Sequence, residues 1–490
     1  MNSAASSFES PSKITGQAIR IVAVVVLGAF LALLNQTVMS PALPMIMKDF
    51  NIDAGTGQWI MSVYPLVSGI MVPVSAYLIN RFSTRKLFFA SILIFAGGTL
   101  LCAVAPSFTL LIVGRVLQAG ASGILLPLVA VVPMLVFPVE KRGTAMGMAG
   151  IVMSAGPAIG PVAGGAVIDA MGWRAMLAFI VPLALITLVL GIVMLKNVGT
   201  LTKPKFDALS VVLCTIAFGG LLYSFSSASS AGWLSFEVIV PVILGALCLV
   251  LFIRRQFKLD EPLLDLSTLK NPTFRSAALI VTLINAACLV TNTLFPLLLQ
   301  TVHGASAFET GMAMLPAAAV GIILSPISGI IFDRFGAKAI SIVGLVMMTG
   351  ALWALSFSSA ATPIVLITIL CTLQATGQVL ANMPVNTWGI NALSNDKIAH
   401  GNAIANTGRQ VAGGLSTALI VTIMTSVTTA NMQVGVVDSI ALGIDAGYFA
   451  CTVLGVLSLL VAIVAFARTK KGKKTASVAS NTSSEVNTDN

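Results

Sequence analysis

Charged side chains are scarce in this chain of 490 residues. Asp, Glu, Lys and Arg together make up 9% of it and hydrophobic residues 57%, whereas charged residues are about a quarter of a soluble protein. This composition excludes an ordinary soluble protein. Only two histidines, His303 and His400, are present, and they stand apart in predicted connecting segments, so we expect no metal site. No Gly-Lys-Ser/Thr loop for nucleotide phosphates is present either, which excludes ATP as the direct energy source.

The six cysteines and the net charge of +10 indicate no further chemistry. Every cysteine lies in or beside an apolar run, without metal-like pairing, so we expect small core residues rather than disulfides or ligands. The basic residues fall between apolar segments, which argues against nucleic-acid binding. Neither a catalytic cluster nor a large domain outside the membrane is visible. We therefore predict a polytopic membrane protein that is not an enzyme.

Apolar windows of roughly 20 residues, the length that crosses the hydrocarbon core of a bilayer, divide the chain into sets of six, two and six. The fourteen windows cover residues 19–41, 57–79, 87–105, 108–131, 143–168, 174–195, 206–227, 236–254, 276–299, 308–331, 339–358, 363–386, 402–427 and 446–467. We accordingly predict an all-α protein with five parts. These are a leader (1–18), a six-helix bundle (19–195), a linker with two additional spans (196–275), a second six-helix bundle (276–467) and a disordered tail (468–490).

The distribution of positive charge predicts the orientation of these spans. On this map most of the 27 Lys and Arg residues fall on one side, and such loops remain in the cytoplasm. We therefore expect a multi-pass protein of the cell membrane with both termini cytoplasmic. The first apolar run follows a polar leader without a cleavage signature, so it is expected to be a retained helix.

An internal repeat suggests two halves of like topology. AYLINRFSTRK (76–86) follows the second span and GIIFDRFGAK (329–338) follows the tenth, so Asn80 matches Asp333 and Arg81 matches Arg334. Transporters are commonly built from such repeats. The Asp333 carboxylate could bond the N-terminus of an adjoining helix and hold an inner gate, or the segment could be a solvated turn. Asn80 would hold its half more weakly.

Small residues dominate the fifth window. Gly156, Gly160 and Gly164 recur every fourth residue and share one helical face, which allows a neighbouring helix to approach closely. Pro157 and Pro161 predict a bend beside that face. We expect a surface on which one bundle moves against the other, with simple packing between helices as the alternative.

Several segments carry a family resemblance. They are LNQTVMSPALP (34–44), GRVLQAGASG (114–123), AGPAIGPVAGG (155–165), GIIFDRFGAK (329–338) and NTGRQVAGG (406–414). Jointly they resemble the major facilitator superfamily, and within it the fourteen-span drug:proton antiporter branch of EmrB and QacA type. The resemblance covers nearly all of residues 19–467. It implies the major facilitator fold and proton-driven efflux of lipophilic or amphiphilic drugs by alternating access. The proton gradient is then the energy source, and no cofactor is expected.

Two arginines fall inside predicted spans. A guanidinium in the bilayer costs at least about 2.5 kcal/mol and needs partners. The resemblance implies that Arg115 is a cavity-facing cation that responds to proton binding nearby; the alternative is a structural arginine satisfied by carbonyls and Gln118. Arg409 poses the same choice. Asn35 stands where many drug:proton antiporters have an acid. It could orient a substrate or contact Arg115, but it cannot take a proton.

Acidic residues are missing from the middle of every predicted span. Asp169 and Glu309 come nearest, each at an outer rim. Asp169 could bind a cation or accept a proton there, or it could be a solvated helix end. Glu309 completes Ser306-x-x-Glu before an apolar run, which is a capping box.

Substrate recognition is expected in a wide apolar cavity with a few polar groups. The candidate lining residues are Trp59, Tyr64, Gln118, Phe295, Met314, Asn382 and Asn386, each of which could instead face lipid or the core. Expected partners are small lipophilic molecules, protons and membrane lipids, and an accessory export subunit is left open. Import or facilitated exit of one metabolite is the alternative function, favoured by the missing mid-membrane carboxylate. A membrane protein without transport is a further alternative.

Overall fold

The computed structural model describes residues 15–137, 156, 159–198, 207–259, 262–394 and 397–485. Every regular element among them is helical, as predicted. The helices of the first half are α1 (Gly16–Phe50), α2 (Ala54–Gly57), α3 (Trp59–Arg81), α4 (Thr84–Ala103), α5 (Phe108–Val136), the helix Ile159–Met171 and α7 (Trp173–Met194). Those that follow are α8 (Ala208–Ala231), α9 (Phe236–Gln256), η2 (Leu266–Lys270), α10 (Pro272–Leu297), η3 (Leu298–Val302), α11 (Ala307–Phe335), α12 (Ala337–Leu355), α13 (Ile364–Ile390), α14 (Ile398–Ala430), η5 (Met432–Val434) and α15 (Val436–Glu485).

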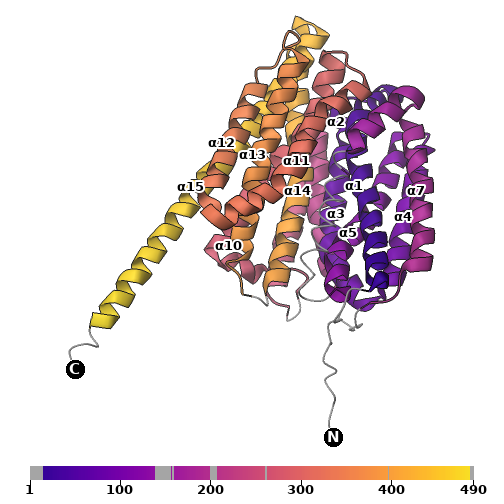
Figure 1. Cartoon of the computed structure of the whole chain (residues 1–490). Helices are drawn as coiled ribbons and strands as arrows, with labels where there is room; N and C mark the ends of the chain where they lie inside the picture. Colours follow the sequence, from indigo (N-terminus) through magenta and orange to yellow (C-terminus); the bar gives the residue numbers. More distant parts are fainter. Residues whose placement is uncertain are drawn as a thin grey trace.

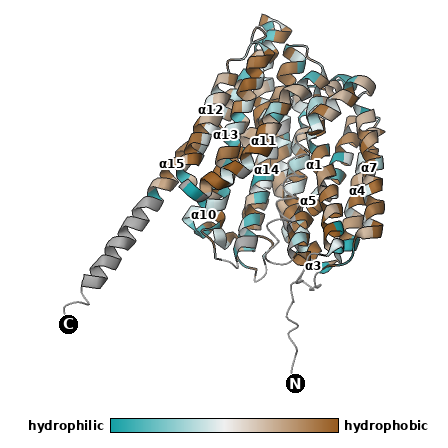
Figure 2. Cartoon of the chain, viewed as in Figure 1, coloured by the Kyte–Doolittle hydropathy of each residue, from teal (hydrophilic) through white to brown (hydrophobic). Residues whose placement is uncertain are grey.

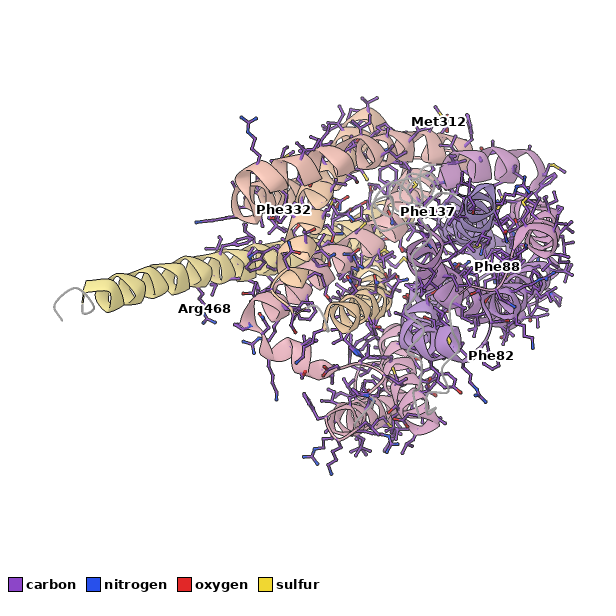
Figure 3. All side chains as sticks on the ribbon, turned by 60° about the horizontal axis from the view of Figure 1, so that its bottom comes forward. Phe82, Phe88, Phe137, Met312, Phe332 and Arg468 are labelled. Carbon is purple, nitrogen blue, oxygen red and sulfur yellow. The ribbon has the colours of Figure 1, made fainter. Side chains whose placement is uncertain are left out.

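The helices stand side by side in two groups (Figure 1). We call the first group, from α1 to α7, the N-bundle and the second, from α10 to α15, the C-bundle. The end at which α1 begins, drawn at the bottom of Figure 1, is the lower end, and the opposite end is the upper end. Hydrophobic residues dominate the outward helix faces in Figure 2. Phe88 lies fully buried inside the N-bundle, whereas Met312 on α11 is exposed (Figure 3).

Twelve of the described helices are long and apolar enough to cross a membrane, against the fourteen predicted. The windows that lie outside these twelve fall on α3, a helix of 23 residues, and on the shorter helix Ile159–Met171. The bounds differ most at the last span. The predicted window begins at residue 446, whereas α15 begins at Val436 and continues to Glu485, through residues predicted to be a polar tail.

The two bundles repeat one helix crossing. In the N-bundle, a Cβ added to Gly98 of α4 would lie 2.9 Å from the carbonyl oxygen of Gly114 on α5. In the C-bundle, a Cβ on Gly344 of α12 would lie 2.6 Å from the carbonyl oxygen of Gly377 on α13. Such approaches require glycine, because any side chain would separate the two backbones. The third and fourth long helices of each bundle therefore cross in the same close manner, as a repeat of like topology requires.

The two additional helices, α8 and α9, form a hairpin beside α14 and α3. At the lower end, Asp207 caps α8 and pairs with Arg255 of α9, whose Nε lies 3.0 Å from Oδ2 and whose Nη2 lies 2.9 Å from Oδ1. Burial alone would raise the pKa of the Asp207 carboxyl, but the hydrogen bonds from Arg255 and Ser210 outweigh it and lower that pKa. The pair therefore closes the lower end of the hairpin.

Replacing Asp207 by alanine is expected to lower the free energy of unfolding by about 1 kcal/mol, since both the cap and a two-point ion pair are lost. Because the pKa of this carboxyl is lowered on folding, its stabilisation is present above the ordinary Asp pKa and is lost as the pH falls through the folded value. Thermal unfolding of the detergent-purified protein measures the change. Glu237→Ala, an exposed acid at the other end of α9, is the control, and an equal loss in both variants would contradict the assignment.

Candidate functional site

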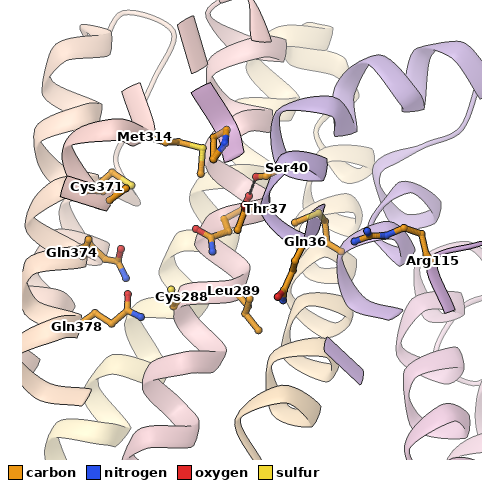
Figure 4. Close-up of a pocket in the computed structure, with 16 residues that line it drawn as sticks. Gln36, Thr37, Ser40, Arg115, Cys288, Leu289, Met314, Cys371, Gln374 and Gln378 are labelled. Atoms are coloured by element: carbon orange, nitrogen blue, oxygen red, sulfur yellow. Dashed lines mark hydrogen bonds between the residues drawn. The ribbon is translucent and has the colours of Figure 1, made fainter. Parts of the chain in front are cut away.

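A cavity of about 320 Å³ lies between the two bundles (Figure 4). Its walls are mostly apolar, with a few amides and one guanidinium. They consist of Gln36, Thr37, Ser40, Met61, Arg115 and Pro161 from the N-bundle, and of Cys288, Leu289, Asn292, Met314, Ala317, Ala318, Cys371, Gln374, Ala375 and Gln378 from the C-bundle. We call it the central cavity. Because both bundles supply its walls, any movement of one bundle against the other changes its shape and access.

A second cavity of about 250 Å³ lies within the C-bundle and shares Gln378 with the first. We call it the inner cavity. Its walls are Ser325 of α11, Gln378, Val379, Asn382, Met383 and Asn386 of α13, and Arg409 of α14. Three predicted residues, Asn382, Asn386 and Arg409, thus lie together. The Arg409 guanidinium donates to the Asn406 side chain one turn earlier on the same helix.

Arg115 of α5 is 1% exposed and is held by neutral groups. Its Nη1 donates to Gln118 Oε1 at 3.0 Å and its Nη2 to the Ile60 carbonyl at 3.3 Å. The guanidinium carbon lies 4.4 Å from the centre of the Tyr64 ring, in cation–π geometry. Its Nε makes no hydrogen bond among the described residues. Arg115 therefore has the structural partners that one interpretation predicts and also the position in the cavity wall that the other requires.

Tyr64 and Asn35 lie behind that wall. The Tyr64 hydroxyl donates to the Ala32 carbonyl at 3.0 Å and is hydrogen-bonded to Ser122. Asn35 is fully buried beside Tyr64, and the cavity is lined instead by Gln36, the next residue of α1, and by others beyond it. Gln118 also holds Thr99 of α4, its Nε2 donating to the Thr99 hydroxyl at 3.0 Å. These side chains form the support that fixes the Arg115 guanidinium.

The glycine stripe faces the N-bundle's own α1. A Cβ on Gly156 would meet Leu33 at 3.2 Å, one on Gly160 would collide with Thr37, and one on Gly164 would lie 3.0 Å from Val38. The stripe therefore packs two helices of the same bundle together, which is the simpler of the two interpretations. A different face of the helix Ile159–Met171 makes the contact with the C-bundle.

That contact lies at the upper end, against the start of α11. A Cβ on Gly165 would lie 2.5 Å from the Ala307 carbonyl oxygen, and one on Gly311 would lie 2.7 Å from the carbonyl carbon of Pro161. Asp169 accepts hydrogen bonds from the backbone N–H groups of Ala307, at 3.1 Å, and Phe308, at 2.7 Å. A carboxylate at a helix N-terminus is stabilised by the free N–H groups and the helix dipole. We call these contacts the upper seam.

Two further hydrogen bonds join the bundles in the upper half. The Gln300 amide donates to the Pro41 carbonyl at 3.0 Å, and the Ser40 hydroxyl donates to the Asn292 carbonyl. Glu309 does not cross the seam. It forms the predicted capping box, in which Ser306 N–H donates to Glu309 Oε2 at 2.8 Å and Glu309 N–H donates to Ser306 Oγ at 3.1 Å.

Four further predicted residues line neither cavity. Trp59 packs against Tyr223 of α8 with ring centres 6.4 Å apart. Phe295 of α10 is buried in the hydrophobic core. Arg81 and Arg334 are exposed at the lower ends of α3 and α11. Pro157 and the side chains of Asn80 and Asp333 lie outside the described residues.

Sequence reasoning missed two features of the C-bundle. Gln374 and Gln378 belong to a polar row on α13 whose spacing of four residues is visible in the sequence. Asp445 escaped notice because the predicted last window began one residue after it. It lies inside α15, half-buried, with Oδ1 buried and without a hydrogen-bond partner among the described residues. One turn further along the same helix, Tyr448 is fully buried, and its hydroxyl has no hydrogen-bond partner among the described residues.

Comparison with known proteins agrees with this architecture. The family model described as Major Facilitator Superfamily matches residues 25–417. The uncharacterized MFS-type transporter YcnB of Bacillus subtilis is 41% identical, over 90% of this chain and 93% of its own. The lincomycin resistance protein LmrB of Listeria monocytogenes is 35% identical, over 91% of this chain and 97% of its own. A crystal structure of a bacterial homolog of the human lysosomal transporter Spinster, inward-facing and unoccupied, superposes with a TM-score of 0.67 at 15% identity, over 92% of this chain and 97% of that one. The chain therefore belongs to the major facilitator superfamily and is a membrane-embedded transporter of small molecules, not an enzyme.

Proposed function

We propose that this transporter exports lipophilic or amphiphilic drugs and other toxic compounds by alternating access, driven by the proton gradient. The observation that carries the proposal is the central cavity, whose walls come from both bundles and are largely apolar with a few amides. Such walls suit varied lipophilic compounds. Relatives named for lincomycin resistance and multidrug resistance support the same class of substrate.

We further propose the fourteen-span topology of the EmrB- and QacA-like branch, in the cell membrane with both termini cytoplasmic. The excess of Lys and Arg on one side of the map supports it, as do the 23-residue length of α3 and the additional α8–α9 hairpin. In this orientation the upper end faces outward. The hydrogen bonds of the upper seam then hold the outer side closed, and loss of these contacts opens it.

Proton coupling requires an acid that lies within the membrane. We propose Asp445 for this role, because one of its oxygens is buried without a hydrogen-bond partner in the described part of the chain. A carboxylate oxygen that is buried without a donor is costly when charged, so this acid binds a proton readily, although the Ser358 backbone N–H favours its charged form in part. Tyr448 lies one turn further along the same face of α15 and is fully buried in the C-bundle.

Everted membrane vesicles containing the protein test the proposal. We expect proton-gradient-dependent uptake of several members of a panel of lipophilic dyes and antibiotics, abolished by a proton ionophore. Asp445→Asn should lose most of that dependence, whereas Asp438→Asn, an exposed acid in the first turn of the same helix, should behave like the wild type. Uptake of panel compounds that is indifferent to the ionophore would rule out proton coupling.

The Asp169 contact at the upper seam gives a separate prediction. Asp169→Ala removes two hydrogen bonds to the N-terminus of α11, a loss of about 1 to 2 kcal/mol by analogy with helix caps. The ratio of the closed to the open upper end should therefore fall about tenfold. Reaction of the cavity cysteines with a membrane-impermeant thiol reagent from outside measures this shift. Glu309→Ala, which removes a cap of the same helix without crossing the seam, should leave the reaction rate unchanged; equal effects would show that only helix stability is involved.

Transport of a single metabolite is the second candidate function. None of the described residues lining the central cavity is acidic, so the acid at the substrate site that many drug:proton antiporters use is missing from this wall. The panel separates the two candidates, since a metabolite transporter would leave all of its dyes and antibiotics where they started.

A further inference from the structure

Among the described lining residues, the two cavities together contain two positive charges and no acid. Arg115 lies in the wall of the central cavity and Arg409 in the wall of the inner cavity. Guanidinium groups stay protonated in proteins. Within the described part of the chain, neither cavity has an Asp or Glu in its wall, and the contacts made by Arg115 and Arg409 are to neutral groups. Both positive charges are therefore available to interact with a ligand in the cavities.

A row of amides connects the two cavities. Gln374, Gln378, Asn382 and Asn386 recur every fourth residue of α13 and so share one helical face. The first two face the central cavity, opposite Arg115 (Figure 4), and the last three line the inner cavity. The row thus leads from the central cavity to the inner cavity, whose wall contains Arg409.

One amide of this row lacks a partner. Gln374 is 3% exposed, and its Nε2 makes no hydrogen bond among the described residues. Across the cavity, Arg115 Nε is also buried and also makes no hydrogen bond among the described residues. Both atoms are donors, and a buried donor without an acceptor is costly. A ligand with acceptor oxygens is favoured by the Arg115 charge and by the Gln374 and Gln378 amides of this wall, whose side chains can turn toward it. A quaternary cation has no acceptor to offer and meets two positive charges.

From this arrangement we infer that the joined cavities select anionic and neutral, acceptor-rich amphiphiles and exclude permanent lipophilic cations. Carboxylate, sulfonate, phenolate or carbonyl oxygens occupy the end near the arginines and amides, while the apolar part of the molecule lies against Met61, Leu289 and Met314 in the central cavity. The inference rests on the proposed export function and narrows its substrate class.

Two hydrophobic ions of nearly identical size and shape test this inference. Tetraphenylborate and tetraphenylphosphonium differ chiefly in the sign of their charge, and neither has an acceptor oxygen, so the pair tests the charge selection by itself. Their binding to the purified full-length protein in lipid nanodiscs is followed by tryptophan fluorescence. We expect at least tenfold tighter binding of the anion. Because partition into lipid also differs between the ions, the measured quantity is the ratio of the two dissociation constants in each variant, compared in the same lipid.

Arg409→Gln should reduce that ratio severalfold, and Arg409→Lys should preserve it. Arg275→Gln is the matched control, because Arg275 is exposed at the lower end of α10 and lines neither cavity. Equal or tighter binding of the cation, a ratio that Arg409→Gln leaves unchanged, or binding of neither ion by protein that exports other compounds overturns the inference. If vesicles export no compound of any charge, the proposed export function fails instead, and the two failures are thereby distinguished.

Discussion

Replacing Gly311 by valine is expected to reduce export at least a hundredfold while leaving the protein folded. Gly311 lies in the upper seam, where a single added Cβ would already stand 2.7 Å from the carbonyl carbon of Pro161 and 2.9 Å from the Cα of Val162. These are backbone atoms and cannot turn aside as a flexible side chain can. Valine therefore forbids the closed upper end, and a transporter that cannot close one side cannot complete its cycle.

The matched control for this variant is Gly321→Val on the same helix, because a Cβ at Gly321 meets nothing within 4 Å. The native cysteines Cys288 and Cys371 line the central cavity, so they report its access without any added label. A membrane-impermeant thiol reagent applied outside cells should modify them in Gly311→Val and much more slowly in the wild type and in Gly321→Val. Normal export by Gly311→Val would show that this contact does not have to form.

Replacing Arg115 by alanine is the second change with a large expected effect. The change removes the charged hydrogen bonds that Arg115 donates to Gln118 and to the Ile60 carbonyl. It also removes the cation–π contact with the Tyr64 ring. Each charge-assisted hydrogen bond contributes about 1.5 to 3 kcal/mol. It also removes the one charge in the described wall of the central cavity. We expect export in vesicles to fall at least tenfold.

The role of Arg115 is separated from stability by a second variant. Gln118→Ala removes the hydrogen-bond partner and leaves the guanidinium in place, so it should lower the unfolding temperature but retain more export than Arg115→Ala. Size-exclusion chromatography in detergent checks that each variant is folded. A folded Arg115→Ala protein that exports at the wild-type rate would show that the role assigned to this cation is wrong.

Local features were predicted well from the sequence. Glu309 forms the capping box because its partner Ser306 is three residues away. Gln118 accepts a hydrogen bond from Arg115 because the two residues lie one turn apart. Both contacts follow from helical geometry alone. The predicted beginning of the last span, residue 446, was wrong by contrast, since α15 begins at Val436. Its first turns at Val436 contain Asp438 and Asp445, and a hydropathy window rejects acids that a folded bundle accommodates.

Contacts between segments far apart in the chain were not predictable in the same way. Asp169 was expected at a rim, but its partners on α11 lie 138 and 139 positions away. The glycine stripe showed that one helix face has almost no side chains, but it did not show which helix would pack against that face. In the structure this helix is α1. Trp59 and Phe295 were candidates for the cavity because their residue types suit one, with burial in the core as the alternative. The sequence could not distinguish the two, since a side chain of the same type also fills a core.

The amino-acid sequence by itself determined that the chain is an all-helical membrane protein with apolar spans set by bilayer thickness, because a spanning segment must satisfy its backbone hydrogen bonds internally and be apolar along its length. The five matching segments also indicated its superfamily. Only the tertiary structure decided which faces meet: the upper seam, the amide row opposite Arg115, and the placing of Arg409 with Asn382 and Asn386. Helix periodicity fixes what a face contains, whereas the choice of neighbour depends on how all the helices pack at once.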